Sequence, residues 1–415
     1  MSELTLTKDQ QNAYNKFSDF ILDPFDRMFV LEGYSGTGKS TLVEKLIEDL
    51  PKLLKTKQLI DNNPEKYWDI LLTATTNKAA ENLSFITGKD VTTIHSALGL
   101  RVMTDYKTGK SRLKEKDKSE ILTDTVLFID EASYIDNQLL DLIQTRTKGC
   151  KIVFIGDPAQ LLTVGCKRSP VFQSNLTTAK LEQVVRQTDG SPITDLATKF
   201  RHTVNGAGFF SFAPDGESVT HMPREQFEQE VAKEFTRNDW SYKDSKVLSW
   251  TNKCAINFNK GIRNLVTGDP KFSIGDYAIC NQYVYSKKGD IKTDQLVLIT
   301  DIMPMVRHGL KGNFFELDNR VQFFMPDCRA EWKRAVKEAQ DKDELEKVAE
   351  MTTQWVDLRA AYACTINKAQ GSTYDRVFID LDDLKKCRDG NQLARMLYVG
   401  VSRARDKVVL TGDLV

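Results

Sequence analysis

The sequence predicts an α/β fold in which helices cover parallel sheets. Two observations support this fold class: short apolar runs without polar alternation recur along the chain, and each is followed by a segment with a helical pattern. The pattern fills the first 160 residues and returns after residue 245. Because 415 residues suffice for roughly two to four domains, we expect two α/β domains with smaller insertions.

The first α/β segment contains four predicted strands and two clear helix candidates. The strands are expected to be buried on both faces, since their apolar runs are continuous. They comprise residues 27–33, 69–75, 125–132 and 151–158. The helix candidates comprise residues 40–50 and 77–88.

Residues 99–120 interrupt this order of strands and helices. The turn sequence Asp-Tyr-Lys-Thr-Gly-Lys stands between two short flanks, which predicts a β-hairpin inserted between strands. The segment carries more basic than acidic side chains, so a positive patch is expected within a chain whose average charge is neutral.

The second α/β segment is itself interrupted. Alternating β-rich runs and turns in residues 271–326 predict a small all-β module, such as a five-stranded barrel. The charged segment 329–355 lacks Pro and Gly and is expected to be helical and solvated. The flanking apolar runs lie in residues 245–252, 360–371, 376–381 and 407–412.

The composition excludes several classes of protein. Fifty-eight basic and 58 acidic residues give a net charge of +0, so a polyanion would have to be held by local patches. No apolar run approaches the roughly 18 to 20 residues that cross a bilayer, and the first residues lack a signal-peptide pattern. The seven cysteines are scattered, which disfavours a disulfide framework or a zinc ribbon. We expect a soluble cytoplasmic protein.

Residues 33–40 carry the strongest local motif. They read Gly-Tyr-Ser-Gly-Thr-Gly-Lys-Ser, which is the G-x-x-x-x-G-K-[ST] pattern between a predicted strand and a predicted helix. Such glycines let backbone N–H groups surround a β-phosphate at a helix N-terminus. We expect Lys39 to reach the β- and γ-phosphates and Ser40 to hold Mg²⁺. The predicted ATP-binding residues here are Gly33, Gly36, Thr37, Gly38, Lys39, Ser40 and Thr41.

Further residues fit phosphoryl transfer. Asp130 and Glu131 follow the apolar run 126–129, where a P-loop protein needs a metal-shell carboxylate and a general base. Gln160 ends the next strand and could contact both the γ-phosphate and the attacking water. Arg186 and Arg403 are candidates for the cations that neutralise charge on the γ-phosphate.

These motifs occur in the order found in a known family. The ordered set GYSGTGKST, TATTNKAA, TTIHSAL, FIDEAS, IGDPAQLL, VVRQ, WTNK, NKAQGSTYDRV and LYVGVSRAR resembles superfamily 1 helicases, and most of all the RecD-like branch, which includes bacteriophage enzymes. The resemblance runs from about residue 4 to the C-terminus, with 190–244 and 271–355 similar only in layout. It implies an ATP-dependent DNA helicase that moves 5′ to 3′, with ATP and Mg²⁺ between two domains.

The resemblance also implies how the chain is divided. Two RecA-like P-loop NTPase domains are expected, with a strand-separating pin in the first and a small SH3-like β-barrel in the second. The implied ranges are 1–175 for the first domain with the pin at 96–122, 176–270 and 356–415 for the second domain, 271–328 for the SH3-like module and 329–355 for a helical extension.

Site roles follow from the motifs that match. Gln10 corresponds to an adenine-reading glutamine, and Gly371 lies in a motif of the second domain that faces ATP. Single-stranded DNA and strand junctions are the implied partners, with possible single-strand binding or replication proteins, and the protein is expected to be a monomer. The residues implied to hold DNA are Thr75, Thr76, Asn77, His95, Tyr106, Thr251, Asn252, Thr365, Lys368 and Gln370.

Two other functions are compatible with parts of the sequence. An ATP-switched nucleic-acid binding protein without strand separation would need the same P-loop and DNA-facing motifs, so the hairpin at 99–120 distinguishes it from a helicase. A small-molecule P-loop kinase or regulatory NTPase would have no use for Asn-Lys-Ala-Gln-Gly or Gly-Val-Ser-Arg-Ala-Arg in the second domain.

Overall fold

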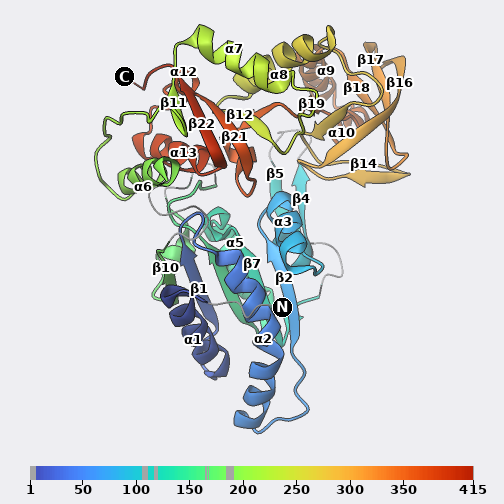
Figure 1. Ribbon diagram of the computed structural model, residues 1–415. Coiled ribbons are helices and arrows are strands. Elements are labelled where there is room, and N and C mark those ends of the chain that lie inside the picture. The colour runs from blue at the N-terminus through green and yellow to red at the C-terminus, as the bar shows by residue number, and fades with distance from the viewer. Residues whose placement is uncertain are drawn as a thin grey trace.

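The computed structural model describes residues 6–104, 111–115, 120–163, 166, 168–183 and 191–414. Their helices and strands form two lobes, one above the other, and the C-terminus lies in the upper lobe (Figure 1). Within these residues, no helix combines the length and the apolar character needed to cross a membrane.

A six-stranded parallel sheet forms the centre of the lower lobe, in the order β10-β1-β9-β7-β2-β3. It confirms the four strands predicted in this region. Burial is nearly continuous along β7 and complete along β9, because helices cover both faces of the sheet. The strands are β1 (Met28–Gly33), β2 (Asp69–Ala74), β3 (Thr92–Thr93), β7 (Thr125–Asp130), β9 (Lys151–Gly156) and β10 (Thr177–Leu181).

Helices pack on each face of this sheet with a separate apolar core. One core joins Phe17, Phe20 and Leu46 to the sheet, and the other joins Leu98 and Ile143 to it. The helices are α1 (Lys8–Leu22), α2 (Lys39–Ile60), α3 (Asn77–Thr87), α4 (Ile94–Ala97) and α5 (Asn137–Thr145), with short 3₁₀ turns at Ala132–Tyr134 and Pro170–Phe172. A small parallel pair, β6 (Leu122–Thr123) and β8 (Thr147–Lys148), lies beside the sheet.

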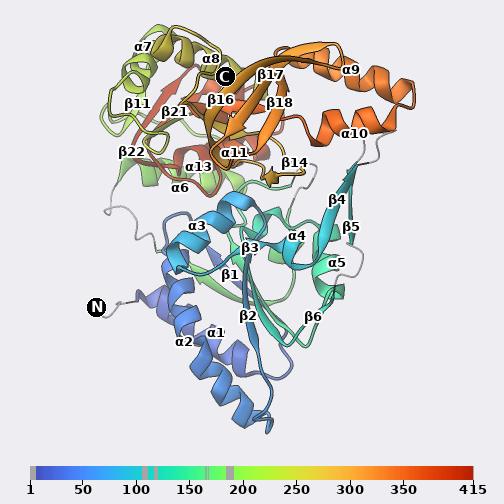
Figure 2. The same cartoon turned by 90° about the vertical axis from the view of Figure 1, so that its right-hand side faces the viewer.

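The strands β4 (Leu100–Thr104) and β5 (Ser111–Glu115) pair antiparallel, as expected for a hairpin within residues 99–120. Arg146 holds the base of the hairpin, because its guanidinium donates to the Glu115 carboxylate at 2.9 Å and to the Glu120 carbonyl at 2.9 Å. Both views show the two strands rising from the lower lobe toward the upper one (Figures 1 and 2).

The upper lobe contains a second, five-stranded parallel sheet in the order β11-β22-β21-β12-β20. Its strands are β11 (Val219–His221), β12 (Ser245–Ser249), β20 (Ala363–Thr365), β21 (Tyr374–Asp380) and β22 (Ala404–Thr411). Its helices are α6 (Pro192–Val204), α7 (Arg224–Phe235), α8 (Asn252–Thr267), α11 (Ile366–Ala369), α12 (Leu381–Leu384) and α13 (Gly390–Val401).

A five-stranded antiparallel sheet in the order β18-β17-β16-β13-β19 completes the upper lobe. Its strands are β13 (Tyr277–Cys280), β16 (Leu296–Arg307), β17 (Leu310–Leu317), β18 (Gln322–Pro326) and β19 (Leu358–Ala360). The hairpin of β14 (Val284–Ser286) and β15 (Gly289–Ile291) and the helices α9 (Arg329–Asp341) and α10 (Leu345–Thr353) belong to the same region.

Two strands pair across the expected domain boundaries. β10 pairs with β1, so the first sheet extends to Leu181 and not to residue 175. β19 pairs with β13, so the antiparallel sheet takes a strand from residues 358–360, which had been assigned to the second α/β domain. Both strands are short and continue a sheet built from distant residues, so their own sequences do not show which sheet they join.

The segment 329–355 forms two helices, and its apolar side is not solvated. The chain turns at Asp343, whose φ of 54° lies in the left-handed region. Trp332, Val348 and Met351 pack with Phe324 and Trp355 into one small core. The rings of Phe324 and Trp355 meet edge to face with centroids 4.7 Å apart.

Trp355→Ala should therefore destabilise this part of the upper lobe by about 3 to 5 kcal/mol, because Trp355 is 0% exposed and its removal leaves a cavity. Urea denaturation followed by circular dichroism measures the loss. Tyr67→Ala, at a residue that is 76% exposed, serves as the control and should change stability by less than about 0.5 kcal/mol. Equal midpoints for the two variants would contradict the packing described.

Candidate functional site

A cavity of about 410 Å³ lies between the two lobes, and both lobes line it. The lower lobe contributes the P-loop, the end of β7 and the turn after β9. The upper lobe contributes the turn after α11 and Arg403, which lies two residues beyond the end of α13. The lining residues that the sequence had singled out are Gly36, Gly38, Lys39, Ser40, Thr41, Asp130, Glu131, Gln160, Gly371 and Arg403.

The P-loop has the backbone geometry that its glycines permit. Gly38 caps α2 with a φ of 74°, in the left-handed region that favours glycine. A Cβ on Gly33 would lie 2.8 Å from Thr37 Oγ1, so any larger residue would push the loop apart. The Lys39 ammonium bends back over the loop and donates to the carbonyls of Gly33 at 2.6 Å and Tyr34 at 2.8 Å. The lysine is therefore held at the place where a phosphate would bind.

Asp130 and Glu131 lie where β7 ends, beside the P-loop. The Glu131 N–H donates to Asp130 Oδ1 at 2.8 Å, and Glu131 has a φ of 54°, which is uncommon for a residue other than glycine. Burial raises the pKa of Asp130 to about 7, and the Glu131 charge adds to the shift while Lys39 opposes it. Strained backbone and a shifted carboxyl pKa are both typical of functional sites.

Gln160 is buried in the turn after β9. Its Oε1 atom has no hydrogen-bond partner within the described part of the chain. Arg395 of α13 fixes this turn from the other lobe, because its guanidinium donates to the carbonyls of Pro158 and Gln160, both at 2.6 Å. An unsatisfied buried amide beside the P-loop fits a ligand with polar atoms.

Two side chains of the upper lobe cross to the lower one. Arg403 is 4% exposed, and its guanidinium reaches Ser35 Oγ of the P-loop at 3.4 Å while also donating to the Ser372 carbonyl at 3.2 Å. Gln370 donates to Glu131 Oε2 at 3.0 Å. Gln370 had been expected to hold DNA, but in this structure it contacts the predicted general base. Arg186 lies outside the described residues.

Gln10 lies against the P-loop from the side of α1. Its Nε2 atom donates to the Thr37 carbonyl at 3.2 Å, while its Oε1 atom accepts the Thr7 N–H at 3.0 Å. The second bond belongs to the capping box that begins α1. Gln10 therefore holds a P-loop residue directly, and its role toward an adenine stays a prediction.

Several polar side chains that were expected to hold DNA already have partners within the fold. The Thr75 hydroxyl donates to the Glu131 carbonyl at 3.0 Å, and the Thr76 hydroxyl caps α3. The Thr251 hydroxyl caps α8 and donates to Asp383 at 2.8 Å, and Asn252 accepts from Arg359 at 2.8 Å. Thr365 occupies the N-cap position of α11 and is largely buried.

Asn77 and Lys368 meet the loop that follows β15. Asn77 donates to the Thr293 carbonyl at 3.3 Å, and the Lys368 ammonium lies 2.6 Å from Asp294 Oδ1. The antiparallel module, residues 277–326 with β19, thus contacts both lobes at two residues predicted to bind DNA.

His95, in α4 of the lower lobe, is half-buried. Burial lowers its pKa, and the Asp136 charge opposes the shift. Tyr106 lies outside the described residues.

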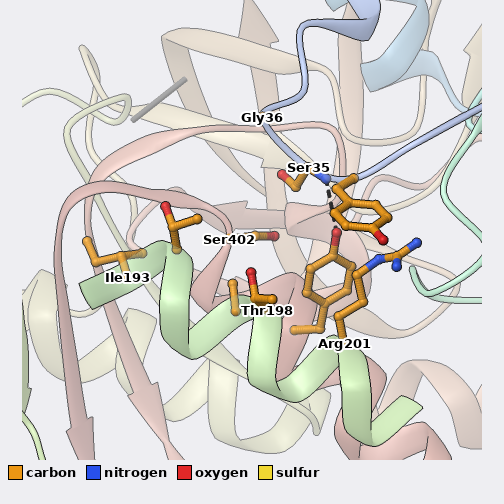
Figure 3. A pocket seen from close by; sticks show the side chains of 10 residues that line it. Ser35, Gly36, Ile193, Thr198, Arg201 and Ser402 are labelled. Atoms are coloured by element: carbon orange, nitrogen blue, oxygen red, sulfur yellow. Dashed lines mark hydrogen bonds between the residues drawn. The ribbon is translucent and has the colours of Figure 1, made fainter. Parts of the chain in front are cut away.

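Sequence reasoning missed a second group of residues beside the P-loop. The Ser35 N–H donates to the Tyr398 hydroxyl oxygen at 3.0 Å, drawn as a dashed line in Figure 3, and the Tyr398 hydroxyl donates to Asp157. Arg201 contacts Asp157 at 3.0 Å and stacks over the Tyr34 ring at 3.5 Å. Asp157 lies in the motif IGDPAQLL and Tyr398 in LYVGVSRAR, but neither had been given a role, and Arg201 lies outside the motifs.

The chain is similar to several known proteins. Residues 5–216 match the AAA domain family, and residues 360–411 match the UvrD-like helicase C-terminal domain. The ATP-dependent DNA helicase dda of Enterobacteria phage T4 is 27% identical over 456 aligned residues, which cover 96% of this chain and 98% of the relative. The ATP-dependent RecD2 DNA helicase of Deinococcus radiodurans is 31% identical over 179 residues, which cover 42% of this chain and 22% of the relative.

Among solved structures, the Pif1 helicase from Bacteroides in complex with ADP-AlF3 and ssDNA has the same fold. It superposes with a TM-score of 0.50 at 17% identity, covering 100% of this chain and 94% of the other. Two parallel sheets with a P-loop cavity between them define a helicase-type P-loop NTPase fold. The chain belongs to the AAA domain family, whose match spans more than half its length, and its sequence is similar to DNA helicases of the RecD and Dda type.

The stability of the nucleotide-free chain should depend on the charge of Asp130. Its folded pKa of about 7 lies above its ordinary value of 3.8, so the folded chain holds an extra proton between these pH values. That stabilisation is full below about pH 4 and is lost as the pH rises through about 7. Asp130→Asn, which stays neutral, should therefore gain stability relative to wild type as the pH rises from about 4 to about 7, and the difference should be level above that pH.

Urea denaturation at pH 5, 6, 7 and 8, without Mg²⁺ or nucleotide, measures this difference. Asp141→Asn, at a more exposed acid of α5, controls for the loss of one negative charge. A constant difference between Asp130→Asn and wild type at every pH would contradict the raised pKa.

Proposed function

We propose that this protein is an ATP-dependent DNA helicase that hydrolyses Mg-ATP between its two lobes and moves 5′ to 3′ along single-stranded DNA. The observation that carries the proposal is that Arg403 and Gln370 of the upper lobe reach Ser35 and Glu131 of the lower lobe. A site completed by both lobes hydrolyses ATP only when the lobes are together, so each hydrolysis cycle is tied to their relative motion. The similar proteins of phage T4 and Deinococcus radiodurans are ATP-dependent DNA helicases.

The residues of the cavity fit a nucleotide with its metal. Mg²⁺ binds few protein ligands and keeps waters and phosphate oxygens, which suits a site with Ser40 and Asp130 alone. When bound there it would neutralise charge on the β- and γ-phosphates. Within the described residues, no group of three or more His, Cys, Asp or Glu side chains forms an alternative metal site.

The chain's own side chains then divide the chemistry. Lys39 leaves the carbonyls of the P-loop for the phosphates, and Glu131 accepts a proton from the attacking water. Gln370 donates to one oxygen of Glu131 and so orients the carboxylate. The free Oε1 of Gln160 can accept a hydrogen bond from that water, and Arg403 supplies positive charge opposite the P-loop.

The DNA strand is proposed to run across both lobes below the antiparallel module. Asn77 and Lys368 mark this path, one on each lobe, and His95 lies on the lower lobe beside α4. Contacts with phosphates and base faces, without groove readout, allow a motor to step along any sequence. The β4–β5 hairpin is proposed to be the pin that separates strands, and its position beneath the upper lobe supports this role (Figure 2). The antiparallel sheet is proposed to be the SH3-like module.

Forked DNA substrates with only a 5′ or only a 3′ single-stranded tail test the proposal. Unwinding should require the 5′ tail. Lys39→Ala should lose both ATPase and unwinding, because no other side chain of the described cavity replaces the ammonium at the phosphates. Arg403→Ala should still bind ATP while its hydrolysis rate falls by about 10²-fold or more.

The outcomes separate the alternatives. A strict 3′-tail requirement would overturn the direction of travel. DNA-stimulated ATPase without strand separation would instead indicate an ATP-switched binding protein. ATPase that is retained in Lys39→Ala would show that the site assignment is wrong.

Asp294→Asn should strengthen binding of single-stranded DNA. Asp294 holds Lys368 at 2.6 Å, so a DNA phosphate must compete with this carboxylate. Both side chains are about a third exposed, so we expect a modest effect: Kd should fall by roughly two- to fivefold, or about 0.5 to 1 kcal/mol. Asn keeps the backbone intact, because it tolerates the φ of 65° found at this position.

Fluorescence anisotropy of a labelled oligo-dT at 50 and 200 mM salt measures the change. Asp318→Asn removes the same charge from an exposed site of the same module and serves as the control. Equal affinities for the two variants would contradict a role for Asp294 on the DNA path.

A further inference from the structure

Asp157 is a fully buried carboxylate that joins the two lobes beside the P-loop. It follows β9 in the lower lobe and is 0% exposed. Arg201 of α6 donates to its Oδ1 at 3.0 Å, and the hydroxyl of Tyr398 of α13 donates to its Oδ2. The Ala159 N–H donates to Oδ1 at 3.0 Å as well. A buried carboxylate is tolerated only with such donors, so these contacts are mutually dependent.

The Tyr398 hydroxyl makes two bonds at once. It accepts the Ser35 N–H at 3.0 Å, the dashed line in Figure 3, and it donates to Asp157. Tyr398 is 2% exposed, so water cannot replace either bond. One phenol oxygen of the upper lobe thus connects the backbone of the P-loop with the turn that carries Gln160.

Arg201 holds the same part of the P-loop from α6. Its guanidinium lies 3.5 Å from the centroid of the Tyr34 ring, which is cation–π stacking at close range. In Figure 3 the Arg201 side chain projects from its helix toward the loop that carries Ser35 and Gly36. Helices α6 and α13 share one apolar core, in which Ile193 and Phe200 belong with Leu397 and Val401. The two helices are therefore expected to move together.

Helix α13 also holds or carries the other groups that are proposed to act on the γ-phosphate. Arg395 lies three residues before Tyr398, on the same face of the helix, and holds the carbonyls of Pro158 and Gln160. Arg403 follows the end of α13 and reaches Ser35 Oγ at 3.4 Å. A movement of α13 must shift Arg403, the Gln160 turn and Ser35 in concert.

We propose that Tyr398 is a positioning residue for ATP hydrolysis, whose hydroxyl, held by Asp157, transmits the state of the P-loop to α13 and so to the upper lobe. The inference rests on the proposed function. A phosphate bound at the P-loop changes the setting of Ser35, and Tyr398 passes that change to the helix that also carries Arg395. The lobes then close with the Gln160 and Arg403 side chains both in place at the cavity between them.

Tyr398→Phe in the full-length chain tests this assignment, because it removes one oxygen and keeps the ring. The DNA-stimulated kcat should fall by about tenfold or more, the loss expected when a hydrogen bond to a charged group is missing in the transition state. The KM for ATP should change by less than about threefold, since Tyr398 does not itself line the 410 Å³ cavity. The number of base pairs opened per ATP should fall as well.

A purely structural role would lower the melting temperature but would not lower kcat selectively at an unchanged KM. Tyr362→Phe is the matched control: Tyr362 is a 9% exposed tyrosine of the same lobe, away from the P-loop, and its variant should keep kcat within about twofold. Hydrogen exchange gives a readout that needs no activity. Backbone amides of residues 33–38 should exchange faster in Tyr398→Phe than in the control.

A double-mutant cycle tests whether the link runs through the carboxylate. Asp157→Asn alone should lower kcat, and adding it to Tyr398→Phe should lower kcat much less than it does in the wild-type background, because both changes break one path. Fully additive effects would overturn the role of Asp157 in the link.

The failure of this inference can be told from failure of the proposed function. The inference alone would be overturned if the wild-type enzyme is active and Tyr398→Phe matches it in three measurements. These are kcat, the number of base pairs opened per ATP, and the hydrogen exchange of the P-loop amides. A wild-type chain without DNA-stimulated ATPase would overturn the proposed function, and the inference with it.

Discussion

Ser35 of the P-loop is held from the upper lobe at both its backbone and its side chain. Its N–H donates to the Tyr398 hydroxyl, and its Oγ lies 3.4 Å from the Arg403 guanidinium. The nucleotide cavity depends on these contacts, because without the upper lobe the P-loop would face open solvent. The same contacts explain how binding at the P-loop can shift the upper lobe. The groups that hold Ser35 are attached to α13, and α13 packs within the core of the second sheet.

Electrostatics in this protein is local. A chain with equal numbers of acidic and basic residues has no general attraction for DNA, and its charges are used in pairs. Asp157 pairs with Arg201 inside the interface between lobes, and Asp294 pairs with Lys368 on the proposed DNA path. The first pair is buried and holds the lobes together. The second is partly exposed, so a phosphate can exchange with the carboxylate at little cost.

Much of the fold and part of the site were predictable, because they depend on residues close together in the chain. The P-loop is a contiguous pattern at a strand end, and Asp130 and Glu131 end the neighbouring strand, so the parallel sheet must bring them to the same edge. The partners of Thr75 and Gln370 were not predictable. Both belonged to motifs associated with DNA, yet both contact Glu131, and the Gln370 contact spans 239 residues of sequence.

The sequence by itself determined the α/β layers, the phosphate-binding loop and the carboxylates beside it, since apolar periodicity and loop chemistry act over a few residues. Only the tertiary structure decided that β10 and β19 complete the sheets they join, and that a carbonyl and a carboxylate after β15 meet two side chains predicted to hold DNA. It also decided which amide the Tyr398 hydroxyl binds, because that amide lies 363 residues away in the sequence. The physical reason is that these contacts depend on how helices and sheets pack. A hydroxyl or carboxylate has the same chemistry wherever it stands in the sequence, and packing selects the partner it meets.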